Sequence, residues 1–127
     1  MKLDLHAHQR LRLVKEMYLK AILQLSQTQA DVKQSHLVEV LQVKKSSVSE
    51  TIQRLQHEGL LEYEPFKSIR LTKKGLRDAK LVLRKYQVLY QFLSDVLKVS
   101  DPHEEACSLE HACSLETITK LEKLLRE

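Results

Sequence analysis

The chain has 127 residues, of which 43% are hydrophobic and 30% are charged, as in an ordinary globular protein and unlike a disordered one. No apolar run approaches the roughly 18 residues of a membrane span, and two cysteines do not make a disulfide framework. The net charge is +4 and the N-terminal residues lack an apolar signal core, so we expect a cytoplasmic protein.

The charge is unevenly distributed along the chain. Residues 1–99 hold 18 Lys and Arg against 10 Asp and Glu, whereas residues 100–127 hold 3 against 7. A basic body followed by an acidic segment is typical of a polyanion-binding part joined to something else. Many globular surfaces are equally uneven, so charge alone leaves nucleic-acid binding as one of several interpretations.

Gly and Pro occur only twice each, which indicates a mostly helical chain with short connections. The first half of the chain predicts three helices. Residues 9–26 carry apolar side chains at helical spacing, and a short helix is expected over residues 35–41. A third helix begins within residues 44–48, with Ser46 or Ser47 as its N-cap and Gly59 as its C-terminal stop. The apolar stripe of the first helix consists of Val14, Met17, Tyr18, Ala21, Ile22 and Leu25.

After Gly59 the hydrophobic period changes to that of strands. Residues 60–64 and 69–71 predict two short strands joined by a turn. Thr72 then caps a long helix that extends to about residue 97. Two further helices are expected, one capped by Asp101 with Pro102 in its first turn, and one capped by Ser114 and running over 115–125.

This order of elements indicates a mainly α protein with an N-terminal winged helix-turn-helix. In that fold, side chains at the start of the second helix face the bases and basic side chains contact phosphates. The long helix after the hairpin is apolar enough to form a dimer interface, although packing within one chain is the alternative. The serines could also act only as caps, and short helical hairpins occur in proteins that never meet DNA. The candidate DNA-binding residues are Lys44, Lys45, Ser46, Ser47, Ser49, Glu50 and Arg54 on the helix, with Lys67 and Arg70 on the wing.

The segment EEACSLEHACSLE, residues 104–116, contains the letters ACSLE twice. On a helix, Cys107, Glu110 and His111 lie within about a third of a turn, and His103 joins the same face one turn earlier. Spacings of three and four residues allow helix side chains to share one metal ion. The second copy lacks this arrangement around Cys113. A small core cysteine, a plain surface or a redox-active thiol are the alternatives for Cys107.

Four stretches together resemble the diphtheria-toxin-repressor family of metal-dependent transcriptional repressors. They are EMYLKAIL (16–23), SSVSETIQRLQHEGLL (46–61), RLTKKG (70–75) and HEEACSLEH (103–111). The resemblance implies a winged helix-turn-helix DNA-binding domain over residues 1–74 and a helical metal-binding and dimerisation domain over residues 75–127. It further implies a homodimer that binds palindromic double-stranded operator DNA when a divalent metal is present, with no membrane and no small-molecule substrate as partner.

The same resemblance implies a set of metal ligands. In the iron branch these are Met17, Cys107, Glu110 and His111, while His103 matches a ligand of an ancillary metal position. Soft Met and Cys ligands favour Fe²⁺ over Mn²⁺, with Co²⁺, Ni²⁺ or Zn²⁺ as substitutes.

The chain also departs from the family pattern. Tyr86 and Tyr90 stand where the ancillary position needs a histidine and a glutamate. Met17, Lys20 and Cys107 stand where the manganese branch has acidic residues, so the two-metal site of that branch is not expected. We also expect the two-domain form, without the SH3-like domain of longer members.

The resulting hypothesis is a Fe²⁺-dependent repressor of metal-uptake genes. The alternative is a winged-helix regulator that has lost metal control or responds to oxidation through Cys107. An enzyme is not expected, because no base and nucleophile pair and no Gly-rich phosphate loop can be identified.

Overall fold

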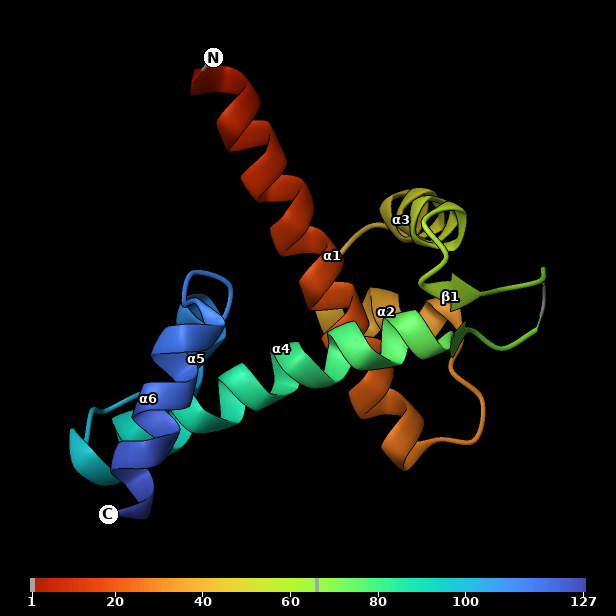
Figure 1. The fold of residues 1–127 in the computed structure, drawn as a ribbon. Helices are drawn as coiled ribbons and strands as arrows, with labels where there is room; N and C mark the ends of the chain where they lie inside the picture. The colour runs from red at the N-terminus through yellow and green to blue at the C-terminus, as the bar shows by residue number, and fades with distance from the viewer. Residues whose placement is uncertain (1, 66) are drawn as a thin grey trace. The chain divides into compact units, whose positions relative to one another are not determined.

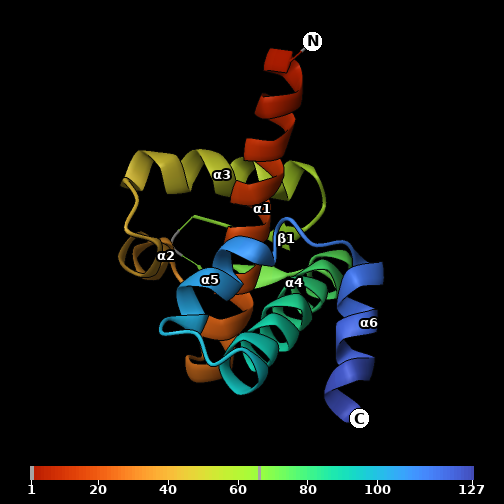
Figure 2. The ribbon, with the colours of Figure 1, turned by 90° about the vertical axis from the view of Figure 1, so that its left-hand side faces the viewer.

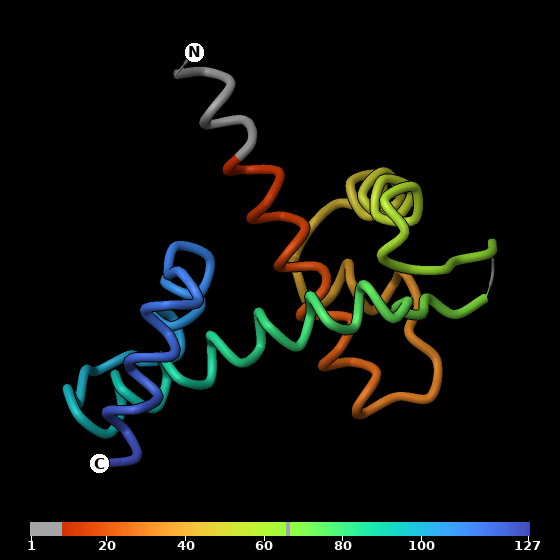
Figure 3. Tube along the Cα trace, viewed as in Figure 1, coloured from red at the N-terminus to blue at the C-terminus, as the bar shows by residue number. Residues whose placement is uncertain are grey.

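The computed structural model describes residues 2–65 and 67–127, with the backbone alone for residues 2–8 (Figure 3). The chain forms two compact units, the first ending at Lys80 and the second comprising Leu81–Glu127, and each is described by itself. Both consist mainly of helices (Figure 1). No helix in the described ranges is both long and apolar enough to cross a membrane.

Three helices, a hairpin and the start of the long helix that follows form the N-terminal unit (Figure 2). The three helices are α1 (Lys2–Thr28), α2 (Gln34–Leu41) and α3 (Lys45–His57), which confirms the three helices expected here, although α1 begins earlier than residue 9. The helices pack through apolar side chains that are 6% exposed or less, and this burial is the main force holding the unit together. From these helices the core includes Tyr18, Leu19, Ala21, Ile22, Leu23, Leu37, Val48, Ile52 and Leu55.

The start of α3 differs from the prediction. Its N-cap is Lys44, whose backbone is extended and whose carbonyl accepts the Val48 N–H at 3.1 Å. No side chain caps this end, so Ser46 and Ser47 lie within the first turn and their hydroxyls are available for other contacts. The other end is as expected, because Gly59 has a φ of +76° and its N–H donates to the Gln56 carbonyl.

The wing is a short antiparallel hairpin of β1 (Leu61–Glu62) and β2 (Arg70–Leu71), with Leu61 opposite Leu71 and Glu62 opposite Arg70. Thr72 joins it to the next helix. Its backbone N–H donates to the Leu60 carbonyl at 3.1 Å, and its hydroxyl donates to the Gly59 carbonyl at 2.6 Å.

The long helix is α4 (Lys73–Gln91), and it continues as a π-helical segment, η1 (Phe92–Val96). The predicted long helix to about residue 97 is therefore confirmed in extent, and its last turn, Phe92–Val96, is π-helical. Hydrophobic periodicity does not distinguish these two helix types over a single turn. The two compact units divide within α4, and the predicted functional boundary between residues 74 and 75 stays a prediction.

Two more helices complete the C-terminal unit, α5 (Pro102–Leu109) and α6 (Leu115–Arg126). Both predicted caps are confirmed. The Asp101 side chain accepts the Glu104 N–H at 3.2 Å, and the Ser114 hydroxyl accepts the Thr117 N–H at 3.2 Å.

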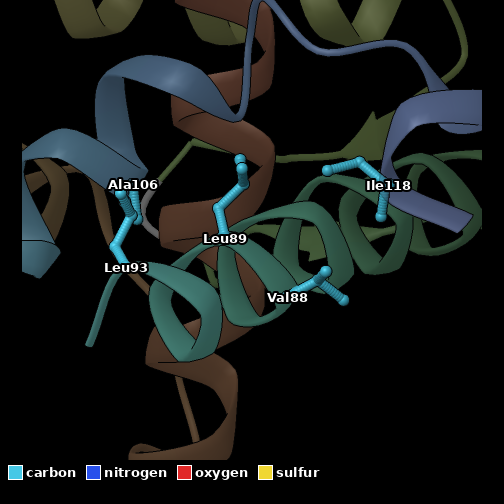
Figure 4. Close-up of a cluster of buried hydrophobic side chains, with 5 residues drawn as sticks. All are labelled: Val88, Leu89, Leu93, Ala106 and Ile118. Carbon is cyan, nitrogen blue, oxygen red and sulfur yellow. The ribbon is translucent and has the colours of Figure 1, made fainter. Parts of the chain in front are cut away.

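A separate apolar core holds these elements together. It consists of Val88 and Leu89 from α4, Leu93 from η1, Ala106 from α5 and Ile118 from α6 (Figure 4). Ala106 and Ile118 are completely buried, so the positions of α5 and α6 against α4 are set by close packing.

Candidate DNA-binding surface and metal site

One face of α3 is polar and open to solvent. Val48, Ile52 and Leu55 are completely buried on its inner face and Thr51 is 7% exposed, whereas Ser49, Glu50, Gln53 and Arg54 are exposed or half-buried. Most of the residues predicted to bind DNA share this exposure. Lys44, Lys45, Ser46, Ser47 and Glu50 are exposed, and Ser49 and Arg54 are half-buried. Five of the seven predicted helix residues are therefore accessible to a partner of the N-terminal unit.

Arg54 differs from the lysines because it is half-buried. Its Nη2 atom is shielded from solvent and has no hydrogen-bond partner among the residues that the structure describes. A guanidinium nitrogen in that position is costly unless a partner satisfies it.

The wing residues predicted to bind DNA are both exposed. Lys67 Nζ lies 2.7 Å from Glu64 Oε2, whereas Arg70 lies on β2 opposite Glu62. Exposed pairs of this kind contribute little to stability, so Lys67 can leave Glu64 for a phosphate at small cost.

The first predicted metal ligands lie together on α5. His103 and Cys107 are one helical turn apart, and Cys107 Sγ is 3.8 Å from His103 Nε2 and 4.0 Å from Nδ1. His103 is exposed and Cys107 half-buried. A nitrogen and a sulfur bound to one tetrahedral ion are about 3.6 Å apart, so this pair is already near the separation that a shared metal requires.

Glu110 and His111 follow the end of α5. The helix ends at Leu109 and Glu110 is its C-cap, with helical backbone angles and its N–H donating to the Ala106 carbonyl at 2.9 Å, so Glu110 continues the helical turn as predicted, whereas His111 lies in the turn that follows. Glu110 is completely buried, the His111 side chain is 10% exposed, and Glu110 Oε1 lies 3.1 Å from His111 Nε2. Two donors in contact at this distance also suit one ion.

The two pairs do not merge into one site in this structure. Among residues 2–65 and 67–127, no three His, Cys, Asp or Glu side chains come close enough together to hold a metal ion. Met17 is half-buried on α1, in the N-terminal unit. The donors have the right chemistry and lie in two suitable pairs, and the complete five-residue ligand set stays a prediction.

Tyr86 has a role in this region that the sequence did not predict. The sequence analysis noted only that it stands where the ancillary metal position of the family has a ligand. Its hydroxyl lies 2.7 Å from His103 Nδ1, and the two rings meet edge to face with centroids 5.6 Å apart. Burial raises the pKa of the Tyr86 phenol, and the nearby Cys107, Tyr90 and Glu110 side chains raise it further. The hydroxyl therefore stays protonated at neutral pH. No sequence signal indicated this contact, because Tyr86 and His103 lie on different helices.

The second ACSLE copy contributes its cysteine to the packing of the C-terminal unit. Cys113 is half-buried and packs against the apolar core of the C-terminal unit, and it is not joined to Cys107 in a disulfide. Lys85 Nζ donates to the Cys113 carbonyl at 2.9 Å. Core packing of this cysteine fits the interpretation of the second copy as a sequence echo.

A winged helix-turn-helix followed by a small helical unit that carries His, Cys and Glu donors defines a class of proteins, the winged-helix transcriptional regulators. Two domain families match the chain. The N-terminal DNA-binding domain of the iron dependent repressors matches residues 10–69, and their metal binding and dimerisation domain matches residues 72–127. The chain belongs to the iron dependent repressor family, whose members are DNA-binding repressors and not enzymes. The predicted family and fold class are thereby confirmed.

Individual relatives agree with this assignment. The chain is 36% identical over 109 residues to the HTH-type transcriptional regulator MJ0568 of Methanocaldococcus jannaschii, covering 84% of this chain and 87% of that protein. It is 31% identical to the diphtheria toxin repressor of Corynebacterium diphtheriae, covering 88% of this chain and 50% of that protein. A solved manganese-dependent transcriptional repressor in complex with manganese superposes with a TM-score of 0.81 at 31% identity. The match covers 87% of this chain and 52% of that chain. The chain thus spans about half the length of the diphtheria toxin repressor and of the manganese-dependent repressor.

Proposed function

We propose that this protein is a cytoplasmic, homodimeric transcriptional repressor that binds palindromic operator DNA when Fe²⁺ is present and controls metal-uptake genes. Residues 1–74 would bind the DNA, and residues 75–127 would bind the metal and form the dimer. Family membership supports the general class, whereas the operator, the ion and the genes are parts of the proposal.

One observation carries the metal dependence. The Glu110 carboxylate is completely buried and lies 3.1 Å from His111 Nε2. Burying a carboxylate costs several kcal/mol unless cationic or hydrogen-bonding groups compensate it. A divalent ion bound by Glu110 and His111 would add to the compensation that His111 gives.

The ligand set favours Fe²⁺. The residues that would hold the ion are Met17, Cys107, Glu110 and His111, with His103 beside them, and the ion would supply a positively charged link between side chains. A thioether and a thiolate suit Fe²⁺, Co²⁺, Ni²⁺ or Zn²⁺ better than Mn²⁺. Positions 17, 20 and 107 also lack the acidic side chains that a manganese site would need.

The switch would depend on Met17. This residue lies on α1 of the DNA-binding unit, whereas the other ligands lie after α4. Joining them through one ion would restrict α1 relative to the dimerisation unit, and would favour the spacing of the two α3 helices that matches successive major grooves.

The decisive experiment measures DNA binding with and without Fe²⁺ under anaerobic conditions. Duplexes are first selected from a random pool in the presence of Fe²⁺, and binding to the selected duplex is then compared in the two conditions. We expect binding to depend on Fe²⁺, and His111→Ala to abolish this dependence because it removes the strongest nitrogen ligand. The repeat provides a matched pair of variants, since Cys107→Ala should weaken metal binding and Cys113→Ala should not.

Met17→Ala separates metal binding from the switch. Calorimetry should show that metal still binds, more weakly, while DNA binding no longer responds to it. If metal binding and metal-stimulated DNA binding both keep wild-type strength, Met17 is only a core residue and the proposed switch is wrong.

A regulator without metal control is the second candidate. It is favoured by the absence of a three-donor group in the described part of the chain and by Tyr86 in place of an expected ligand. In that case, selected duplexes bind equally with and without Fe²⁺. If Cys107 is a redox switch, peroxide then changes DNA binding in the wild type but not in Cys107→Ala.

A further inference from the structure

The outward face of α3 carries a narrow polar stripe. Counted at about 100° per residue, Glu50 lies about 160° around the helix from the completely buried Ile52. Gln53 lies about 140° from Val48, which is also completely buried. The stripe is therefore the part of α3 that is farthest from the core. Its members are all exposed, and they are Ser46, Glu50, Gln53 and His57.

Basic side chains flank the stripe on both sides. The exposed Lys45 and the half-buried Arg54 lie about 180° apart around the helix, and the stripe runs between them. A helix that enters the major groove faces base edges along its outermost line, while the residues at its sides approach the phosphates of the two strands. The distribution of charge around α3 therefore fits this arrangement, with uncharged and acidic groups at the bases and cationic groups at the backbone.

The side chain of Gln53 matches one base in particular. A carboxamide donates and accepts at once, and it can form two hydrogen bonds with the N6 donor and the N7 acceptor of adenine. An ionised Glu50 carboxylate only accepts, which matches the N4 donor of cytosine. Along the helix axis the two residues are about 4.5 Å apart, close to the step of roughly 3.4 Å between base pairs.

We propose that Gln53 is a specificity-determining residue of the DNA-binding surface, and that it binds an adenine in the base pair next to a cytosine bound by Glu50. Each half-site of the operator would then contain these two bases in neighbouring pairs. The inference rests on the proposed function and deepens it, because it names part of the sequence that the protein recognises. Gln53 was not among the residues that the sequence predicted to bind DNA.

The test selects duplexes from a random pool with the full chain under anaerobic conditions, once with Fe²⁺ and once with a chelator. Wild type, Gln53→Ala and Gln53→Glu are each taken through the selection, and their affinities for the wild-type duplex and for an unrelated duplex are then measured. Gln56→Ala is the matched control. Gln56 is an exposed glutamine on the same helix, but it lies about 90° around the helix from the middle of the stripe.

We expect the wild type to select cytosine and adenine in neighbouring base pairs. Gln53→Ala should lose the preference for adenine and bind the selected duplex roughly 5- to 150-fold more weakly, the usual effect of losing one bidentate base contact. Its binding to the unrelated duplex should stay unchanged, because glutamine carries no charge for a phosphate contact. Gln53→Glu should select cytosine in place of adenine, since a carboxylate cannot donate. Gln56→Ala should match the wild type.

Several results would overturn the inference. If Gln53→Ala and Gln53→Glu select the same bases as the wild type, Gln53 reads no base, and the proposed function is unaffected. If Gln53→Ala weakens binding to the selected and the unrelated duplex equally, its contact carries no sequence information. A wild type that selects no sequence in either condition removes this inference together with the proposed function. If the variants behave as expected both with Fe²⁺ and with the chelator, the inference holds and only the proposed metal control fails.

Discussion

Gly75 is a position where one hydrogen atom decides the packing. It lies in the first turn of α4, and a Cβ added there would sit 1.8 Å from the Leu60 carbonyl oxygen and 2.8 Å from its carbon. The same Leu60 carbonyl accepts the Thr72 N–H, so the backbone just before β1 cannot easily move away. Glycine therefore lets α4 begin directly against the wing.

Gly75→Ala should destabilise the protein, although alanine normally favours a helix over glycine by about 1 kcal/mol. We expect a loss of about 3 kcal/mol or more in the free energy of unfolding, because backbone must shift to relieve the overlap. Urea unfolding of the metal-free protein measures it. Gly59→Ala is the control, since nothing lies within 4 Å of its added Cβ and only the strain of its positive φ, roughly 1–2 kcal/mol, applies. A Gly75→Ala protein as stable as the wild type would contradict the tight contact.

At the scale of elements, each helix presents one apolar face to a core and leaves the other face free for contacts. α3 illustrates this, because its buried stripe fixes its orientation and leaves Lys44–Ser47 and Glu50 exposed. α6 is attached in a second way as well, by a two-point contact in which Arg84 Nη2 and Nε donate to Glu122 Oε1 and Oε2 at 2.8 and 3.3 Å.

Lys45→Ala should weaken binding to all duplexes alike, because a phosphate contact carries no sequence information. The logarithm of the binding constant falls linearly with the logarithm of salt concentration, and we expect this slope to decrease by about one. Lys44→Ala and Arg54→Ala should behave similarly. Lys120→Ala is the control, as it removes the same charge from an exposed position on α6. Unchanged slopes for all three variants would remove the assignment of α3 to phosphate contacts.

The Arg84–Glu122 contact predicts a pH dependence of stability. The hydrogen bond from Arg84 lowers the pKa of Glu122 below its ordinary value of 4.5, against a smaller opposing effect of burial. A lowered folded-state pKa stabilises the protein above the unfolded value, and this contribution is lost as the pH falls through the folded value. Wild type should therefore exceed Glu122→Gln in stability at about pH 7, and the difference should shrink toward about pH 3.

Urea unfolding at both pH values measures this difference. Glu116→Gln serves as the control, because Glu116 pairs with Lys120 at the exposed surface of the same helix. A Glu122→Gln difference that stays constant with pH would show that the Arg84 contact does not contribute through the carboxylate charge.

At the scale of the whole molecule, the C-terminal unit leaves many apolar side chains uncovered. Those more than a third exposed include Leu81, Tyr90, Val96, Leu97, Leu109, Leu115 and Leu124. A matching domain family named for dimerisation covers the same residues. Uncovered apolar surface of this kind is typical of interaction sites.

We expect a homodimer that forms without metal, since an apolar interface does not need the metal ligands. Sedimentation at micromolar concentration, with a chelator present, should give the dimer mass. Leu97→Glu should raise the dissociation constant by about tenfold or more, as for a charge placed in an interface core. Leu11→Glu, an equally exposed position on α1, should not. A wild-type monomer in the presence of metal would contradict the proposed assembly.

The sequence by itself determined the features that depend on neighbouring residues. Helical spacing located α1, α2 and α3, side-chain oxygens at Asp101 and Ser114 marked the starts of α5 and α6, and the residue composition identified the donor types. These are local effects, set by periodicity and capping within a few residues. The His103 and Cys107 pair belongs here as well, because a spacing of four residues on a helix is sufficient to place both on one face.

Only the tertiary structure decided how distant segments meet. The complete burial of Glu110, the hydrogen bond between Tyr86 and His103, and the fit of Gly75 against Leu60 all join residues from different elements. The π-helical turn of η1 also escaped the sequence, because hydrophobic periodicity does not distinguish it from an α-helical turn. Periodicity gives the face that a residue occupies on its own helix, whereas the identity of its neighbours depends on how the helices pack.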